Sequence, residues 1–194
     1  FDYDREVVII NITRIKKIIL LDDGKQVIAF PGSTLHELEG ELSSIKRAPH
    51  SVIGSTTIGA TIVGGIANNA GGALCKRGSS YTELSLYARV NEEGNLELIN
   101  HLGIKNLGET PEEIFENLEK GSFSKEDIVG MDRAASDREY QNRIRNIDAK
   151  IPNRYNADPN RLYEVSGSAG KVVAFAVRVD TYPMPKEKKV FYLG

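Results

Sequence analysis

The chain has 194 residues with 27% charged and 40% hydrophobic residues and a formal net charge of −2. This length suits one domain with a sizeable core or two small ones, and the composition is that of a globular protein. The small net charge gives no electrostatic reason to expect nucleic acid as a partner. No apolar run approaches the roughly 20 residues of a membrane-spanning helix, and the single Cys75 excludes an internal disulfide.

The first half of the chain contains a strand signal, a hairpin signal and a helix signal. Residues 7–10 form a continuous apolar run, which predicts a buried strand. Residues 18–21 and 27–30 flank the turn sequence Asp-Asp-Gly-Lys and predict a β-hairpin. Thr34 and Glu37 form a capping box, so a helix is expected to start there. Its apolar face is predicted to consist of Leu35, Leu38, Leu42 and Ile45.

The second half continues with hairpins and helices. Residues 84–90 alternate apolar and polar, which predicts a half-buried strand, and Glu93-Gly94-Asn95 turns the chain into a second one over 96–99. Thr110-Pro111-Glu112-Glu113 opens a helix that should end at Lys120-Gly121. Residues 132–161 are dense in charges of both signs and predict a solvated, ion-paired connection. A last long strand is predicted over 171–182. Hairpins without regular β-α-β alternation indicate an α+β fold.

The stretch SVIGSTTIGATIVGGIANNAGG at residues 51–72 combines apolar residues with many glycines. A glycine inside an element costs about 0.5–1 kcal/mol relative to alanine, so something is expected to lie close to this backbone. Two interpretations remain open. The glycines let a helix pack tightly on a sheet, or residues 54–57 form a loop that faces a ligand's phosphates before a helix starting near Ile58. In the second interpretation Ile58, Ile62 and Ile66 are the buried side. The common phosphate-loop and dinucleotide motifs are absent.

Several strings resemble one flavoprotein family over nearly the whole chain. They are FPGSTL at 30–35, PHSVIGS at 49–55, IGAT at 58–61, GGIANNAGG at 64–72, NHLGI at 100–104 and RYNADP at 154–159. They are similar to the PCMH-type FAD-binding domain of the vanillyl-alcohol-oxidase-type flavoproteins. Within that family they most resemble the quinone-dependent, membrane-associated D-lactate dehydrogenases of bacteria.

The resemblance implies a particular part of such an enzyme. The fold expected is the second subdomain of the FAD-binding domain, an antiparallel sheet flanked by helices. Residues 1–182 are expected to be FAD-binding domain without its upstream subdomain, and residues 183–194 to begin the connection to a substrate or cap domain. A first residue other than Met agrees with a piece of a longer protein.

The resemblance also implies which residues hold the cofactor, FAD. By position, the flavin-contacting residues are Gly54, Thr61, Gly71 and Ala174, and their backbone neighbours are Ser55, Gly59, Gly64 and Gly65. The segment Gly167-Ser168-Ala169-Gly170 is expected to close the FAD site. No catalytic residue and no metal ligand is predicted in this chain.

The activity implied is FAD-dependent oxidation of D-lactate to pyruvate, with electrons passed to membrane quinone. The enzyme is expected as a peripheral protein on the cytoplasmic face of the bacterial inner membrane, with the membrane contact made by regions outside this chain. The piece alone is expected to be inactive. Two alternatives are a dehydrogenase or oxidase of another 2-hydroxy acid such as glycolate, and a non-catalytic nucleotide-binding module.

The remaining reactive residues give weaker signals. His36 is expected on the surface of its helix, and His101 is expected to be a structural anchor. His50 directly precedes the glycine-rich stretch, so a contact near the cofactor and a structural hydrogen bond are both open. Cys75 is expected to be passive, and the histidines have no metal-ligand spacing.

Overall fold

The protein is described from a computed structural model that covers residues 4, 6–50, 59–71, 76–129, 132–150, 162–187 and 189–192. Its elements in chain order are β1 (Ile18–Leu21), β2 (Gln26–Ala29), α1 (Leu35–Ser44), β3 (Arg47–Ala48), α2 (Ile62–Ala67), β4 (Ser85–Val90), β5 (Leu96–Asn100), α3 (Pro111–Lys120), the 3-10 turn η2 (Lys125–Asp127), α4 (Tyr140–Arg143), β6 (Val173–Asp180) and β7 (Tyr182–Pro183).

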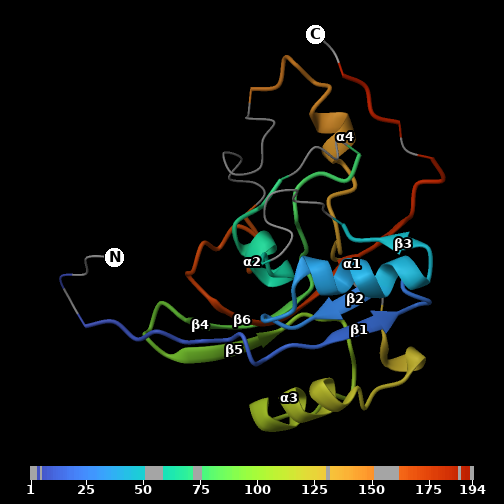
Figure 1. The fold of residues 1–194 in the computed structure, drawn as a ribbon. Helices are drawn as coiled ribbons and strands as arrows, with labels where there is room; N and C mark the ends of the chain where they lie inside the picture. The colour runs from blue at the N-terminus through green and yellow to red at the C-terminus, as the bar shows by residue number, and fades with distance from the viewer. Residues whose placement is uncertain are drawn as a thin grey trace.

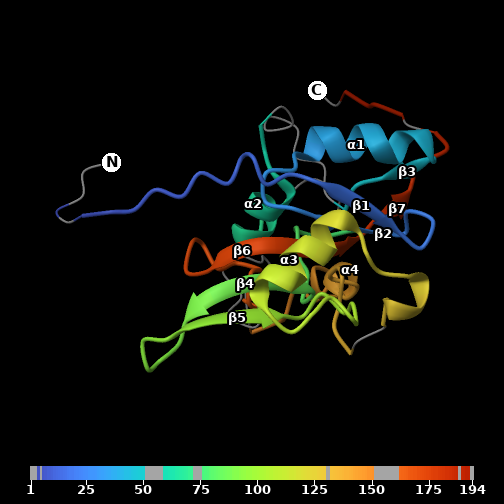
Figure 2. The same ribbon diagram turned by 90° about the horizontal axis from the view of Figure 1, so that it is seen from below.

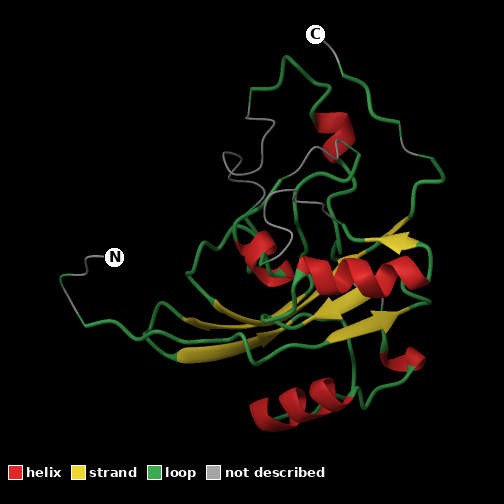
Figure 3. Cartoon of the chain, in the orientation of Figure 1, coloured by secondary structure: helices red, strands yellow, loops and turns green. Residues whose placement is uncertain are grey.

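A five-stranded antiparallel sheet forms the centre of the fold, in the order β1-β2-β6-β4-β5. Helices α1 and α2 lie on one face and α3 on the other (Figure 1). The same arrangement, coloured by type, shows the strands as one layer between helices (Figure 3). Strands β3 and β7 pair separately at one end of α1. The α+β fold with an antiparallel sheet and flanking helices is confirmed.

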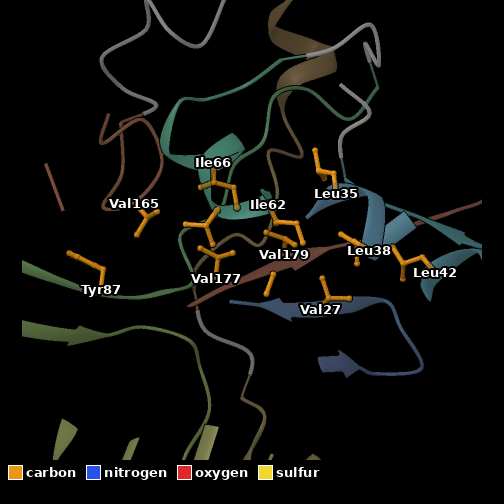
Figure 4. Close-up of a cluster of buried hydrophobic side chains, with 12 residues drawn as sticks. Val27, Leu35, Leu38, Leu42, Ile62, Ile66, Tyr87, Val165, Val177 and Val179 are labelled. Carbon is orange, nitrogen blue, oxygen red and sulfur yellow. The ribbon is translucent and has the colours of Figure 1, made fainter. Parts of the chain in front are cut away.

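The core on the first face joins both helices to the sheet. Leu35, Leu38 and Leu42 of α1 pack beside Ile62 and Ile66 of α2. These side chains meet the strand residues Val27, Tyr87, Val177 and Val179, together with Val165 (Figure 4). Most of these side chains are fully buried, and each contributes about 1.5–3 kcal/mol of hydrophobic stabilisation. This core fixes α2 against β6.

The core on the second face lies under α3, which runs across the sheet in Figure 2. Ile114 and Leu118 of α3 are buried there, and the rings of Phe115 and Phe175 meet edge to face at 4.7 Å between centroids. The helix begins with the predicted capping box, since the Thr110 hydroxyl accepts from the Glu113 amide. It ends at Gly121 with φ of 72°.

The first hairpin and the first helix form as the sequence predicts. Asp22, Asp23 and Gly24 all have positive φ, which suits the tight turn between β1 and β2. The Thr34 hydroxyl accepts from the amide of Glu37, whose carboxylate accepts in return from the Thr34 amide. These hydrogen bonds lower the pKa of Glu37 to about 2, with help from Lys16. Ile45 is the exception to the predicted face, because it caps the helix and is largely exposed.

Three predictions are wrong in detail. Residues 7–10 form no strand and are exposed, with Val8 89% accessible, because no other described strand lies beside them. Strand β4 is not half-buried: Ser85–Ala88 are buried on both sides, since helices cover both faces of the sheet. Helix α2 starts at Ile62, with Thr61 as its N-cap, and not near Ile58.

The charged connection is partly helical where it is described. Residues 140–143 form α4, and Arg143 pairs with Asp137, whose side chain is almost fully buried. Residues 151–161 lie outside the described part. Among the residues that the structure describes, no helix is both long and apolar enough to cross a bilayer.

Candidate functional site

The start of α2 is held against the start of α1. The Thr61 hydroxyl accepts from the Gly64 amide at 3.0 Å, which caps the helix. Thr61 and Thr34, the two N-caps, form an isolated antiparallel bridge. The Leu35 amide donates to the Ala60 carbonyl at 2.9 Å, and the Ile62 amide donates to Ser33 at 3.0 Å. With six residues, α2 is short, so its macrodipole adds little, and the side chains and backbone around it define the site.

The end of α2 is held by the loop that leads into β6. The Gly167 amide donates to the Ile66 carbonyl and the Ala169 amide to the Ala67 carbonyl, each at 3.0 Å. The second bond satisfies the helix-end carbonyl of Ala67, and the first is a further bond to the Ile66 carbonyl, which also accepts from the Asn69 backbone amide. Gly167, Ala169 and Gly170 all have positive φ, so the loop is tightly folded. The segment expected to close the site therefore docks onto α2.

A β-bulge places Ala174 on the α2 side of the sheet. Strand β6 pairs Ala176 with Leu86 but Ala174 with Tyr87, so one extra residue, Phe175, is inserted. The bulge reverses the side-chain alternation: Phe175 packs with the α3 core, and Ala174 packs with the α2 core. No periodicity in the sequence indicated this change of face.

These three features surround a pocket of about 240 Å³, which we call the α2–β6 pocket. Its walls come from the chain before β1, from α2, from the docked loop and from the start of β6. The lining residues are Ile10, Ile12, Thr61, Val63, Gly64, Ala67, Ser168, Gly170, Val172, Val173 and Ala174. Three predicted site residues, Thr61, Gly64 and Ala174, thus come together from positions more than a hundred residues apart.

The other predicted site residues lie around this pocket or outside the description. Gly54 and Ser55 fall outside the described residues. Gly65 is buried in α2, while Gly59 and Gly71 are exposed on either side of the helix. None of these three lines the pocket. Ile10, Ile12, Val63 and Ala67 also line it and were not predicted. Val63 and Ala67 could have been found, because they are four residues apart and share a helix face.

The glycines of this region differ in what surrounds them. Among the described residues, a Cβ on Gly59 would meet nothing within 4 Å, and one on Gly71 would meet the Ser79 hydroxyl at 3.4 Å. A Cβ on Gly32, by contrast, would lie 2.8 Å from the carbonyl oxygen of Thr13. Packing within the described chain therefore requires a glycine at 32 but not at 59 or 71.

Two buried polar side chains have no hydrogen-bond partner within the described part of the chain. His50 is 4% exposed and both of its ring nitrogens lack a partner; Asn69 is 5% exposed and neither amide atom has one. An unpaired buried polar group costs about 1–3 kcal/mol, so such groups call for an explanation. Burial, with the nearby Arg77 charge, lowers the pKa of His50 to about 4. His50 is therefore a neutral imidazole at neutral pH, with one donor and one acceptor to offer.

His101, in contrast, is anchored. Its Nδ1 lies 2.6 Å from Oε1 of Glu164, and the same oxygen accepts from Arg133 at 3.2 Å. The Ser85 hydroxyl donates to the other carboxylate oxygen at 3.2 Å. Glu164 is 12% exposed and has φ of 50°, so this network holds the turn that precedes the docked loop. The structural role expected for His101 is confirmed, and His36 is exposed as expected.

A larger concavity of about 650 Å³ lies elsewhere, between the β1–β2 turn and residues 121–128. It is open and contains none of the predicted site residues, so it is not the candidate site. Within the described residues, no three potential metal ligands among His, Cys, Asp and Glu come together.

Comparison with known proteins agrees with this geometry. Residues 2–95, which include the first hairpin, α1, α2 and all of β4, match the model of the family described as FAD binding domain. The fold and this match are those of an FAD-binding domain, and FAD is the cofactor that they support.

The particular relatives are quinone-dependent D-lactate dehydrogenases. The chain is 53% identical over 193 residues to the enzyme of that name from Escherichia coli K12 and 55% identical to the one from Haemophilus influenzae Rd. It is 45% identical to the one from Corynebacterium glutamicum. Each alignment covers the whole of this chain but only 34% of the relative, so the chain spans about a third of their length.

The residues present fit part of an FAD site. The α2–β6 pocket, at about 240 Å³, is smaller than the roughly 300–1,000 Å³ of complete small-molecule sites. Its walls are small or apolar, which suits a flat ring system. His50 and Asn69 offer hydrogen-bonding groups without partners among the described residues, and both lie within or next to the glycine-rich stretch in the sequence.

Proposed function

We propose that this chain supplies part of the FAD site of a quinone-dependent D-lactate dehydrogenase, which oxidises D-lactate to pyruvate and passes electrons to quinone. The observation that supports this most directly is 45–55% identity to such enzymes along the entire chain. The aligned region spans the segments that form the α2–β6 pocket.

In this proposal FAD, when bound, supplies the redox chemistry, and the chain supplies binding and orientation. Thr61 and Gly64 present a small, capped helix start to the cofactor. Ala174, turned inward by the bulge, and Gly170 form the opposite wall. The apolar side chains between them exclude water from whichever part of the cofactor they cover. The groups that bind the substrate are proposed to lie in the other two thirds of the enzyme.

The exposed residues 7–10 support the proposed domain arrangement. Four consecutive apolar residues are accessible there, and Ile10 also lines the pocket. We infer that another part of the FAD-binding domain covers this segment in the intact protein. Residues 1–182 are then one subdomain of that domain, and residues 183–194 begin the connection to the substrate or cap domain.

Membrane contact belongs to the same proposal. Transfer to quinone takes place at a membrane, and we propose peripheral attachment on the cytoplasmic face of the inner membrane, through regions outside this chain. Washing membranes at high salt, followed by immunodetection of the intact protein, tests this attachment. A peripheral protein should be released into the supernatant by the salt wash. A protein that stays with the membranes at high salt and is released only by detergent would contradict peripheral binding.

The function itself is tested on the intact protein. Purified protein should contain one FAD per chain, and anaerobic D-lactate should bleach the flavin absorbance near its visible maximum. A soluble quinone should restore the colour. Faster bleaching by glycolate than by D-lactate would favour another hydroxy acid, and a protein without flavin would favour a non-catalytic module. An FAD titration of the chain alone then shows whether this part of the site binds by itself.

A further inference from the structure

The side chain of Asn69 is buried, but it makes no hydrogen bond within the described chain that would explain its burial. Its carboxamide offers two N–H donors and one carbonyl acceptor. Neither Nδ2 nor Oδ1 has a hydrogen-bond partner among the described residues, although the residue is 95% buried. Its neighbour Asn68 behaves differently: it is exposed, and its Nδ2 donates to the Gly64 carbonyl at 3.0 Å.

Asn69 does not line the α2–β6 pocket, but it lies directly behind the lining, next to residues of both walls. Its amide donates to the Ile66 carbonyl and so closes α2, whose residues form one wall. A Cβ at position 167 would lie 2.5 Å from the Asn69 side-chain nitrogen, so this side chain packs against Gly167. The next residue, Ser168, belongs to the other wall. The carboxamide is therefore held between the helix end and the docked loop.

The backbone at both positions is adapted to this contact. Asn69 has φ of 46° and Gly167 has φ of 71°, and asparagine and glycine are the residues that adopt this conformation most readily. A side chain at 167 would collide with both Asn69 and Leu162. The arrangement thus keeps the carboxamide in one place without giving it a partner.

We propose that the Asn69 carboxamide hydrogen bonds to a ring edge of FAD that carries a donor beside an acceptor. This inference rests on the proposed FAD site. A pyrophosphate offers only acceptors and would leave Oδ1 unpaired. A heterocycle edge presents donor and acceptor in one plane, the pairing by which asparagine reads adenine. Both the pyrimidine edge of the isoalloxazine and the adenine have this chemistry, and the experiment separates them.

The test uses the intact flavoprotein and its flavin-free form. Asn69→Gly keeps the positive φ and removes the carboxamide, whereas Asn69→Asp keeps the shape and replaces the donor by an anionic oxygen. Asn68→Asp is the matched control, because it adds the same charge one residue away at the surface. Measured quantities are the FAD dissociation constant, the melting temperature of the flavin-free protein and the midpoint potential of bound FAD.

Asn69→Gly should weaken FAD binding about 10- to 100-fold, the loss expected for removing buried hydrogen bonds. The flavin-free protein should melt at the wild-type temperature or higher, and Asn68→Asp should bind FAD within about 2-fold of wild type. If the partner is the isoalloxazine, Asn69→Asp also makes the midpoint potential more negative, because the new charge opposes electron uptake. If it is the adenine, Asn69→Gly instead loses the preference for FAD over FMN.

Two results would overturn the inference. One is FAD binding by Asn69→Gly that equals the wild type. The other is an equal loss of melting temperature in flavin-free and flavin-bound protein, which would show a purely structural role. A wild-type protein that holds FAD but does not oxidise D-lactate would refute the proposed activity and leave this inference standing.

Discussion

Replacing single glycines by alanine separates the two explanations for the glycine-rich stretch. Gly71→Ala adds one methyl group whose nearest neighbour would be the Ser79 hydroxyl at 3.4 Å, an ordinary contact. Gly59→Ala adds a methyl group to open space. Neither glycine has a positive φ in the structure. The change should therefore raise the free energy of unfolding by about 0.4–1 kcal/mol, since alanine restricts the unfolded chain.

Gly32→Ala is the matched control with the opposite expectation. Its Cβ would lie 2.8 Å from the carbonyl oxygen of Thr13 and 3.0 Å from those of Ile12 and Ile15. Backbone atoms move away at a high cost, so a loss of about 1–3 kcal/mol, the usual cost of overpacking, is expected. Urea unfolding of the flavin-free intact protein measures all three variants against wild type.

The effect of the three variants on FAD affinity should be the reverse of their effect on stability. Gly71→Ala and Gly59→Ala are expected to weaken FAD binding while the fold keeps its stability, because the added methyl group occupies space beside the cofactor. Gly32→Ala should change the FAD dissociation constant only in step with its stability. Equal losses of stability at all three positions would show that the glycines serve packing alone. Unchanged flavin content in Gly71→Ala would remove that residue from the site.

Three further predictions concern single side chains. The pKa of His50 is about 4 in the folded protein, below the unfolded value of 6.5. The unfolded state therefore takes up the proton first as pH falls, and stability should drop by about 3 kcal/mol between pH 6.5 and 4. Urea unfolding against pH should show this drop in wild type and lack it in His50→Gln. Glu164→Gln should lower the free energy of unfolding by about 2–3 kcal/mol, because it weakens the charge-assisted hydrogen bond from Arg133. Glu97→Gln removes an exposed ion pair with Arg89 and should lower it by less than about 1 kcal/mol. Thermal melting of both variants measures the difference. Thr61→Val and Thr110→Val each remove an N-cap worth about 1 kcal/mol, but only the former should weaken FAD binding in a titration.

The sequence predicted best those elements that are determined by neighbouring residues. The turn at Asp22–Gly24 and the capping boxes at Thr34 and Thr110 form as expected, because their hydrogen bonds close within four residues. The N-cap of α2, Thr61, lies in the glycine-rich stretch, but the helix was expected to start near Ile58. Without a glutamate three residues after Thr61, the local signal for a start was weaker.

Long-range contacts account for the predictions that were wrong. An apolar run such as residues 7–10 indicates a preference for burial, but burial requires a partner that no local pattern can specify. Strand β4 has alternating residues and is nonetheless covered on both faces, because α2 and α3 lie on opposite sides of the sheet. The bulge at Phe175 depends on the register with β4 and leaves no periodic signature.

In the candidate site, too, part of the arrangement could be predicted from the sequence and part depends on long-range contacts. Resemblance placed Thr61, Gly64 and Ala174 near the cofactor, and the structure brings these three into one pocket. What the sequence could not show is which buried polar side chains of the described chain are left without hydrogen-bond partners. Asn68 and Asn69 are identical residues in adjacent positions, and only the folded chain distinguishes a surface cap from a buried, unpaired carboxamide.

The pocket and the exposed amino-terminal segment share one surface, which the proposed domain arrangement would cover. Ile10 belongs to both: it is accessible, and it lines the α2–β6 pocket together with Ile12. Whatever covers residues 7–10 in the intact protein therefore also narrows the pocket. In the proposed arrangement, covering residues 7–10 and closing the FAD site would occur together, and bound FAD would stabilise both parts by mass action. On this reasoning the chain alone binds FAD more weakly than the intact protein, and the difference measures how much of the site the covering part supplies.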